Sequence, residues 1–210
     1  MGCVKKPFIL LKNKPILAWT LDVFQQCDSI DSILIVTAKG DETRIIDEIV
    51  KPYHFNKVCD VITGGETRQE SVFNALCKVR SDTDIVVIHD AVRPFITKDL
   101  IIKSIEQADQ YGSAIVAVPV KDTIKEADDN GFVSKTLDRQ LLWSIQTPQT
   151  FKYKLIIQAH HYAKENQIQA TDDASLVEQI GHKVKIIIGS YDNIKITTID
   201  DLVIAEAILK

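Results

Sequence analysis

Polar and charged side chains follow several apolar stretches of this sequence at the points where those stretches end. Gly64 and Gly65 precede Glu66, Arg68 and Ser71, directly after a run rich in Val and Ile. Two glycines let a backbone approach a ligand closely, and free N–H groups at a helix start, with these side chains, could bind a nucleobase or a ribose. A β-to-α turn with N-terminal capping explains the pattern equally well, because glycine turns of this kind are common.

A second polar cluster, residues 89–95, begins where the apolar run 85–88 ends. Asp90 and Arg93 lie three residues apart, so they could place a metal ligand beside a phosphate-binding guanidinium. They could also simply pair with each other. We expect His89 to be a partly buried, hydrogen-bonded residue rather than a metal ligand, because no other His or Cys is suitably spaced.

Two later segments add further candidates. Arg139 lies in a predicted hairpin region that we expect to be an arm between subunits, so it could be delivered into a neighbouring subunit, or it could form a surface salt bridge. Lys195 could hold a phosphate as a point charge, with a solvated lysine as the alternative. Asp172 and Asp173 are interpreted as helix caps. Together the clusters offer both anion-binding and cation-binding groups, which suits nucleotide phosphates bridged by Mg²⁺.

The elements that must position these residues alternate between strand and helix. Short apolar runs rich in Val and Ile predict strands over 32–37, 57–62, 84–89, 114–118 and 184–188. Helical periodicity and capping residues predict helices over 15–26, 41–50, 67–79, 97–111, 153–165, 172–179 and 198–209. This order predicts an α/β fold with a mostly parallel sheet, in which ligands bind at the carboxyl ends of the strands.

Residues 119–150 interrupt the alternation. Alternating polar and apolar residues on both sides of Asn130-Gly131 predict an antiparallel hairpin. Such a hairpin must be covered by something, and the obvious candidate is a second copy of the chain. We therefore expect one domain over residues 1–210, with a β-arm excursion over 119–150 that joins a homodimer.

The composition limits the classes of function. Lys and Arg number 25 against 29 Asp and Glu, and this net charge of −4 argues against a nucleic-acid partner. Neither a P-loop nor a GxGxxG motif is present, which argues against a P-loop NTPase and a Rossmann dehydrogenase. No apolar run approaches the roughly 18 residues of a membrane span, so we expect a cytoplasmic protein without a membrane partner. The cysteines lack CxxC spacing and are expected to be free thiols packed in the core: Cys3, Cys27, Cys59 and Cys77.

Taken in order, six segments of the chain resemble the motifs of the 2-C-methyl-D-erythritol 4-phosphate cytidylyltransferase family. They are GGETRQESV, HDAVRPF, Asp122-Thr123, LDRQLLWSIQTPQTF, TDDAS and DNIKITT, and the resemblance runs from about Lys5 to the C-terminus. It implies a three-layer α/β fold of the nucleotidyltransferase, Rossmann-like type and a homodimer joined through a β-arm. It also implies transfer of CMP from CTP to methylerythritol phosphate, with Mg²⁺ as cofactor and pyrophosphate as the second product, in non-mevalonate isoprenoid synthesis.

The resemblance further implies a role for individual residues. The residues that would bind the nucleotide are Gly65, Glu66, Arg68, Ser71 and Ala91. The residues that would bind the methylerythritol phosphate are Asp90, Arg93, Thr123, Thr147 and Asp192, and Asp90 would also lie by the Mg²⁺. The catalytic residues would be Lys6, Lys195 and Arg139, the last contributed by the partner subunit.

Two features leave alternatives open. Ribitol 5-phosphate cytidylyltransferases share HDAVRPF, QTPQ and NIKITT-like segments, although DRQLLW and TDDAS fit the methylerythritol family better. The chain also begins at Met1-Gly2, where the family's glycine-rich, arginine-containing loop would end. We expect the true start to lie upstream, and the alternative is a weakened or non-catalytic relative.

Overall fold

The computed structural model describes residues 5–209, and its elements follow the predicted alternation. The helices are α1 (Ile16–Gln25), α2 (Glu42–Ile45), α3 (Arg68–Leu76), α4 (Lys98–Tyr111), α5 (Tyr153–Glu165), α6 (Asp173–Gln179) and α7 (Ile199–Ile208). The strands are β1 (Leu10–Leu11), β2 (Lys14–Pro15), β3 (Ile33–Thr37), β4 (Val58–Thr63), β5 (Ile85–Ile88), β6 (Ser113–Pro119), β7 (Lys125–Ala127), β8 (Val133–Thr136), β9 (Trp143–Lys152) and β10 (Lys185–Ile188). The predicted helix over 41–50 is α2 followed by a π-helical turn, Ile46–Val50.

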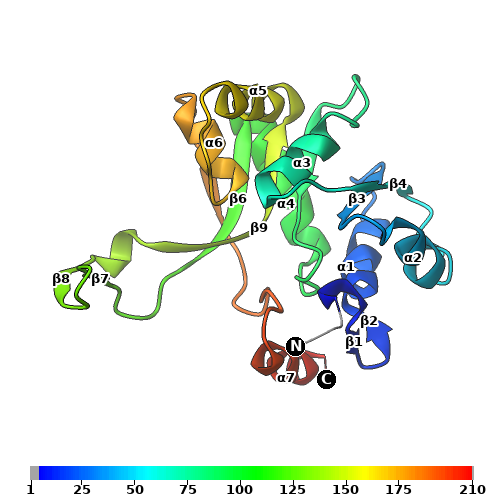
Figure 1. Cartoon of the computed structure of the whole chain (residues 1–210), viewed down its shortest axis with the longest axis horizontal. Helices are drawn as coiled ribbons and strands as arrows, with labels where there is room; N and C mark the ends of the chain where they lie inside the picture. The colour runs from blue at the N-terminus through cyan, green and yellow to red at the C-terminus, as the bar shows by residue number, and fades with distance from the viewer. Residues whose placement is uncertain (1–4, 210) are drawn as a thin grey trace.

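A four-stranded sheet with the order β10–β6–β9–β5 forms the centre of the fold (Figure 1). Strands β10 and β6 are parallel, whereas β9 runs antiparallel to both β6 and β5. Strands β3 and β4 pair in parallel as a separate two-stranded sheet. The fold is thus α/β as predicted, but the central sheet is mixed, and the prediction of a mostly parallel sheet is wrong at β9.

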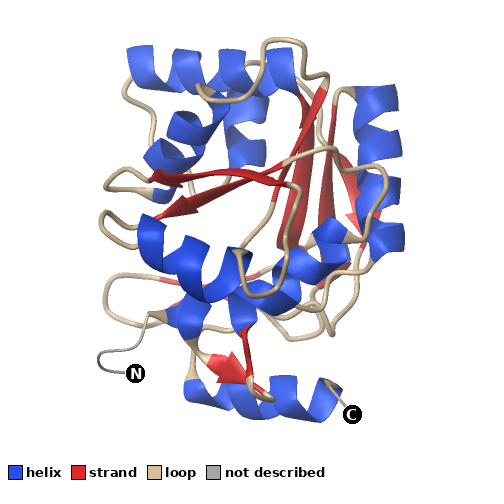
Figure 2. Cartoon of the chain, turned by 90° about the vertical axis from the view of Figure 1, so that its right-hand side faces the viewer, coloured by secondary structure: helices blue, strands red, loops and turns tan. Residues whose placement is uncertain are grey.

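The helices pack on the central sheet through side chains that alternate along β6. Ala114 packs with Ala108 of α4, whereas its neighbour Ile115 packs with Phe151 and Ile156 in the cluster that includes α5 and α6. Successive side chains of a strand point to opposite faces, so α4 and the α5–α6 pair contact different faces of the sheet. Figure 2 shows helices on both sides of the long strands.

The hairpin predicted around Asn130-Gly131 is present as β7 and β8, which pair antiparallel and project from the rest of the chain (Figure 1). The excursion is shorter than expected. Strand β6 extends to Pro119, and residues 143–150 belong to β9 in the central sheet, so the segment that leaves the sheet spans residues 120–142. All residues of β7 and β8 are exposed.

The cysteines differ in their environments. Cys27 is buried as expected, but Cys59 and Cys77 are exposed, so the prediction that they pack in the core is wrong for both. Cys3 and the Met1-Gly2 start lie outside the described residues. None of the helices within residues 5–209 has the length and apolar composition needed to cross a membrane.

Candidate active site

Two adjoining pockets contain most of the predicted site residues. The first, here called the glycine pocket, has a volume of about 620 Å³ and is lined by segments 5–7, 36–41 and 64–71. The second, here called the Asp90 pocket, has a volume of about 150 Å³. Its lining residues are Arg68, Asp90, Arg93, Ile145, Gln146, Thr147, Gln149, Thr171, Asp172 and Lys195. Arg68 lines both pockets and so lies at the border between them.

The turn from β4 to α3 forms one wall of the glycine pocket. Thr67 caps α3 by accepting a hydrogen bond from the backbone N–H of Glu70, and the Glu70 carboxylate accepts one from the Thr67 N–H in return and another from the Glu66 N–H. The Gly65 N–H donates to Ser71 Oγ at 3.1 Å. A Cβ on Gly64 would lie 2.6 Å from Ser71 Oγ, so a side chain does not fit there. The capping interpretation is confirmed, and the same turn faces the pocket.

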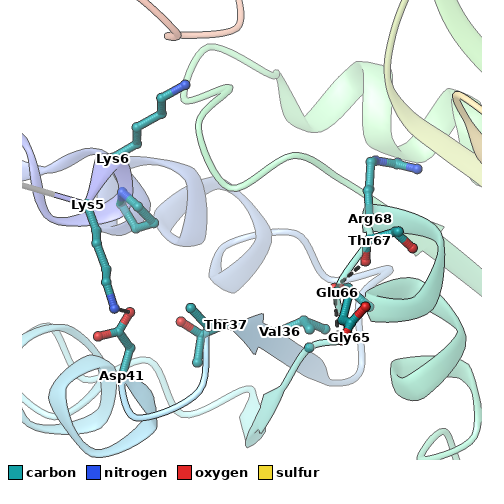
Figure 3. A pocket seen from close by; sticks show the side chains of 13 residues that line it. Lys5, Lys6, Val36, Thr37, Asp41, Gly65, Glu66, Thr67 and Arg68 are labelled. Atoms are coloured by element: carbon teal, nitrogen blue, oxygen red, sulfur yellow. Dashed lines mark hydrogen bonds and ion pairs between the residues drawn. The ribbon is translucent and has the colours of Figure 1, made fainter. Parts of the chain in front are cut away.

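The opposite wall of the glycine pocket carries lysines. Lys5 forms an ion pair with Asp41, and Lys6 lies next to it in a short 3-10 helix, Lys6–Phe8. Figure 3 shows these residues on one side of the pocket and Gly65 to Arg68 on the other, with the Lys6 side chain leading away from Asp41. The pocket is therefore bounded by a helix start on one side and by basic side chains on the other, an arrangement suited to an anionic ligand.

Asp90 is surrounded by cations in the second pocket. Its carboxylate lies 3.1 Å from Arg93 Nε, 3.1 Å from Lys195 Nζ and 3.8 Å from Arg68 Nε. Burial by itself would raise the pKa of Asp90, but the charges and hydrogen bonds of Lys195 and Arg93 outweigh it, and the pKa lies below its usual value. Asp90 is thus ionised at neutral pH. Arg93 and Lys195 therefore present cationic groups to an anion that enters the pocket, beside the carboxylates of Asp90 and Asp172.

A bulge in β9 forms one side of the Asp90 pocket. Ile115 of β6 pairs with Gln149 and Ala117 pairs with Ile145, so residues 146–148 of β9 face a single residue of β6. Bulges of this kind redirect side chains. Here Thr147 Oγ1 accepts a hydrogen bond from the Asp90 N–H at 3.0 Å. The strand missed by the sequence analysis therefore positions the predicted Thr147 against the predicted Asp90.

His89 is a partly buried, hydrogen-bonded residue, as expected. Its Nε2 lies 3.1 Å from the Arg93 carbonyl and its Nδ1 lies 3.0 Å from Thr147 Oγ1. Burial lowers the pKa of His89 to about 4, so the ring is neutral at pH 7. Because a carbonyl only accepts, Nε2 carries the proton, and Nδ1 accepts the Thr147 hydroxyl proton.

Asn193 is a further residue beside the Asp90 pocket, and it was not predicted. Its Nδ2 donates to Gln146 Oε1 at 3.2 Å and to the Thr147 carbonyl at 3.0 Å. Its backbone carbonyl accepts a hydrogen bond from Arg93 Nη1 at 2.8 Å. Asn193 is fully buried and lies two residues before Lys195, so it ties the loop that carries Lys195 to the bulge of β9. Its place in the DNIKITT segment was the one signal in the sequence.

Most predicted residues lie in one of the two pockets. Those in the glycine pocket are Lys6, Gly65, Glu66, Arg68 and Ser71. Those in the Asp90 pocket are Arg68, Asp90, Arg93, Thr147 and Lys195.

Four predicted residues do not line either pocket. Ala91 packs against the core cluster around Phe8, and its carbonyl accepts a hydrogen bond from Thr20 Oγ1. Asp192 is exposed and donates its N–H to Ser190 Oγ. Thr123 and Arg139 are exposed on the excursion.

Asp90 is the predicted metal ligand. Within residues 5–209, no group of three or more His, Cys, Asp or Glu side chains is placed to hold a metal ion. Asp90 offers a single carboxylate, whose Oδ2 faces Arg93 and Lys195 and whose Oδ1 faces Arg68. Mg²⁺ is commonly held by one or two carboxylates together with substrate phosphates. The donor set therefore fits a Mg²⁺ that binds with a nucleotide, and it does not fit a metal held by the protein alone.

Comparison with known proteins identifies the family. The sequence model of the family "IspD: 2-C-methyl-D-erythritol 4-phosphate cytidylyltransferase" matches residues 2–210. A relative of that name from Desulforamulus reducens is 47% identical over 207 residues, which cover 99% of this chain and 88% of the relative. One from Alkaliphilus oremlandii is 49% identical over 205 residues, covering 98% and 87%.

Solved structures agree with the sequence relatives. The crystal structure of 4-diphosphocytidyl-2C-methyl-D-erythritol synthase from Anaerococcus prevotii superimposes with a TM-score of 0.89 and 35% identity, covering 98% of this chain and 90% of that one. A 2-C-methyl-D-erythritol 4-phosphate cytidylyltransferase from Thermus thermophilus gives a TM-score of 0.83 and 31% identity, covering 97% and 93%. The chain belongs to the 2-C-methyl-D-erythritol 4-phosphate cytidylyltransferase family.

Proposed function

We propose that this chain transfers the CMP group of CTP to 2-C-methyl-D-erythritol 4-phosphate, giving CDP-methylerythritol and pyrophosphate for non-mevalonate isoprenoid synthesis. The observation that carries the proposal is the juxtaposition of the two pockets. A glycine turn at a helix start borders the first pocket, and three cations around one carboxylate lie in the second. Arg68 lies between them, where a nucleotide and a second phosphate compound would meet.

Each pocket would bind one substrate. The backbone of Gly65 and the side chains of Glu66 and Ser71 would contact the cytosine and ribose of CTP in the glycine pocket. Arg93 and Lys195 would hold the phosphate of methylerythritol phosphate in the Asp90 pocket. Because Arg93 is fixed by Asp90 and by the Asn193 carbonyl, its guanidinium is already oriented before the phosphate arrives.

The reaction needs no covalent enzyme intermediate. An oxygen of the acceptor phosphate attacks the α-phosphorus of CTP, a P–O bond forms, and the bond from the α-phosphorus to the bridging oxygen breaks. Pyrophosphate leaves with the electron pair of that bond. The acceptor phosphate is already ionised at neutral pH, so no general base is required. The neutral His89 ring therefore has no role as a base in this reaction.

The protein contributes position and positive charge. Lys6, at the wall of the glycine pocket, would neutralise charge on the α-phosphate, and Lys195 would do the same for the attacking phosphate. Asp90 would hold a Mg²⁺ that binds together with the triphosphate, and this ion would neutralise further phosphate charge.

The active assembly in this proposal is a homodimer on a three-layer nucleotidyltransferase-type fold. The excursion of residues 120–142 exposes large apolar side chains, with Phe132 72% and Leu141 77% exposed, and a second copy of the chain would cover them. Arg139 Nη1 donates to the carbonyl of Lys121 at 3.0 Å, two residues before Thr123. If the arm delivers Arg139 into the partner's Asp90 pocket, Thr123 therefore accompanies it.

Pyrophosphate release by the purified 210-residue chain with CTP and Mg²⁺ tests the proposal. The acceptors compared are methylerythritol phosphate and ribitol 5-phosphate, and release with the first alone is expected. Lys195→Ala is expected to reduce kcat/KM by about 100-fold, since a charge that contacts the reacting phosphate is lost. Lys103→Ala, which removes an exposed lysine of α4, is the matched control and should behave as wild type.

Two outcomes would contradict the proposal. Equal or greater release with ribitol 5-phosphate would reassign the acceptor. Absence of release with both acceptors would show that this chain is not a competent cytidylyltransferase.

A further inference from the structure

Asp173 is a buried carboxylate that the proposed chemistry does not use. It is 1% exposed, and its Oδ1 lies 3.2 Å from Nε2 of the buried His160. Its Oδ2 lies 2.7 Å from Arg68 Nη1, although no hydrogen bond within the described part of the chain is aligned on that oxygen. A carboxylate is costly to bury, so a buried Asp173 needs a structural or functional reason.

Helix capping does not explain Asp173. The neighbouring Asp172 is the N-cap of α6, and its carboxylate accepts the hydrogen bond from the Ser175 N–H. The backbone N–H of Asp173 is itself held by Gln149 Oε1 at 3.1 Å. Asp173 is therefore fixed in place by β9, with its carboxylate directed at side chains of α3 and α5 rather than at the start of its own helix.

Arg68 lies between two carboxylates. Asp173 Oδ2 is 2.7 Å from its Nη1, and Asp90 Oδ1 is 3.8 Å from its Nε. Figure 3 shows the Arg68 side chain leading away from Gly65 and Glu66. Without Asp173, the remaining attraction would draw Arg68 toward Asp90, into the space that the acceptor phosphate needs.

We propose that Asp173 is a positioning residue that holds Arg68 at the border of the two pockets. In that position Arg68 can contact the nucleotide while the Asp90 pocket stays open for the acceptor phosphate. The inference rests on the proposed function and adds to it, since it assigns a role to a residue that contacts neither substrate.

A double-mutant cycle on CTP affinity tests the inference. Isothermal titration calorimetry with CTP and Mg²⁺ would compare wild type, Asp173→Asn, Arg68→Ala and the double variant. Asp173→Asn is expected to weaken CTP binding by about tenfold, as for one lost charge-assisted contact. In the Arg68→Ala background the same substitution is expected to change nothing further, because Asp173 acts through Arg68.

Steady-state kinetics adds a readout that general loosening of the fold would not give. Asp173→Asn should raise the KM values for CTP and for the acceptor, with a smaller change in kcat. Tyr153→Phe is the matched control, because it removes a single hydrogen bond to the Leu76 carbonyl at the other end of α3 and leaves Arg68 untouched. It should leave both KM values unchanged.

Several outcomes would overturn the inference. These are an unchanged CTP affinity in Asp173→Asn, multiplicative effects of Asp173→Asn and Arg68→Ala, and no measurable CTP binding by wild type. If Asp173→Asn fails to fold by circular dichroism, Asp173→Glu keeps the charge, moves the oxygens by one methylene group, and is put through the same cycle. Failure of the proposed function is separate: wild type that binds CTP but releases no pyrophosphate would leave the Asp173 cycle valid.

Discussion

At the scale of single residues, the site depends on charges held against one another. Of the three cations around Asp90, the Lys195 side chain is the most exposed, at 42%, whereas Arg93 is 12% exposed. Arg93 is thus a fixed part of the pocket wall, and the Lys195 side chain, paired with Asp90 but open to solvent, can reach an arriving phosphate. The neutral His89 adds no further charge but supports this wall through the Arg93 carbonyl.

The fork of Arg93 makes two contacts that a lysine cannot reproduce. Its Nε donates to Asp90 and its Nη1 donates to the Asn193 carbonyl. We expect Arg93→Lys to raise the KM for the acceptor by about tenfold or more, because a point charge cannot hold both partners. Arg80→Lys is the matched control, since Arg80 pairs with Asp82 on the surface. An acceptor KM unchanged in Arg93→Lys would show that orientation of the guanidinium is unimportant.

Site residues that belong to a recognisable stretch of sequence could be predicted. Residues that matter through contacts with distant parts of the chain were missed. Lys6, Arg68, Asp90 and Lys195 stand out because charged residues follow apolar strands or belong to a recognisable motif. Asn193 matters through contacts with Gln146 and Thr147, which the chain brings together only after folding. Asp173 was interpreted as a cap for the same reason, because its pairing with Arg68 has no local signal.

At the scale of elements, local patterns again set what could be predicted. The five predicted strands lie within three residues of their expected bounds, and so do the helices when the π-helical turn after α2 is counted with it, because apolar periodicity and capping residues are local features. Strand β9 was missed because buried polar residues and a proline are rare in a central strand: Gln146, Thr147, Pro148, Gln149 and Thr150. Three of them, Gln146, Thr147 and Gln149, line the Asp90 pocket.

The capping box of α7 gives a prediction about stability. Thr198 Oγ1 accepts a hydrogen bond from the Asp201 N–H, and the Asp201 carboxylate accepts one from the Thr198 N–H. We expect Thr198→Ala to lower the free energy of unfolding by about 1 kcal/mol, as for other lost N-caps. Urea denaturation measures the change. Thr198→Ser keeps the hydroxyl and should unfold close to wild type, and equal stability of the Ala and Ser variants would contradict the capping role.

The Asp201 carboxylate also makes the stability of the fold depend on pH. Hydrogen bonds from the N–H groups of Thr197 and Thr198 lower the pKa of Asp201 to about 2, from a usual value of 3.8. A lowered pKa means that the unfolded chain binds the proton more readily, so this contribution to stability is full above the usual pKa and is lost as the pH falls toward 2. The free energy of unfolding of Asp201→Asn should therefore fall less than that of wild type between pH 5 and pH 2.5, a range of about two to three units that includes the usual pKa of the carboxylate. Parallel curves for the two proteins in urea titrations would refute it.

At the scale of the whole molecule, the proposed dimer can be tested at the exposed arm. A two-stranded hairpin is marginally stable alone, yet β7 and β8 project from the body and expose Phe132 and Val133 (Figure 1). We expect Phe132→Asp with Leu141→Asp to shift the protein from dimer to monomer, since charges would replace the apolar contact. Light scattering measures the mass. A monomeric wild type would contradict the assignment of the arm to dimerisation.

Mixing two inactive variants would show whether the arm completes the partner's site. In the proposed dimer, each Asp90 pocket uses its own Lys195 and the Arg139 of the other subunit, so the Arg139→Ala and Lys195→Ala homodimers both lack one group at every site. A mixed dimer has one site that lacks both groups and one site that lacks neither. After unfolding and refolding of an equal mixture, half of the dimers are mixed, so about a quarter of the wild-type pyrophosphate release should return. If Arg139 served its own subunit, every site in every dimer would lack one group, and no activity would return.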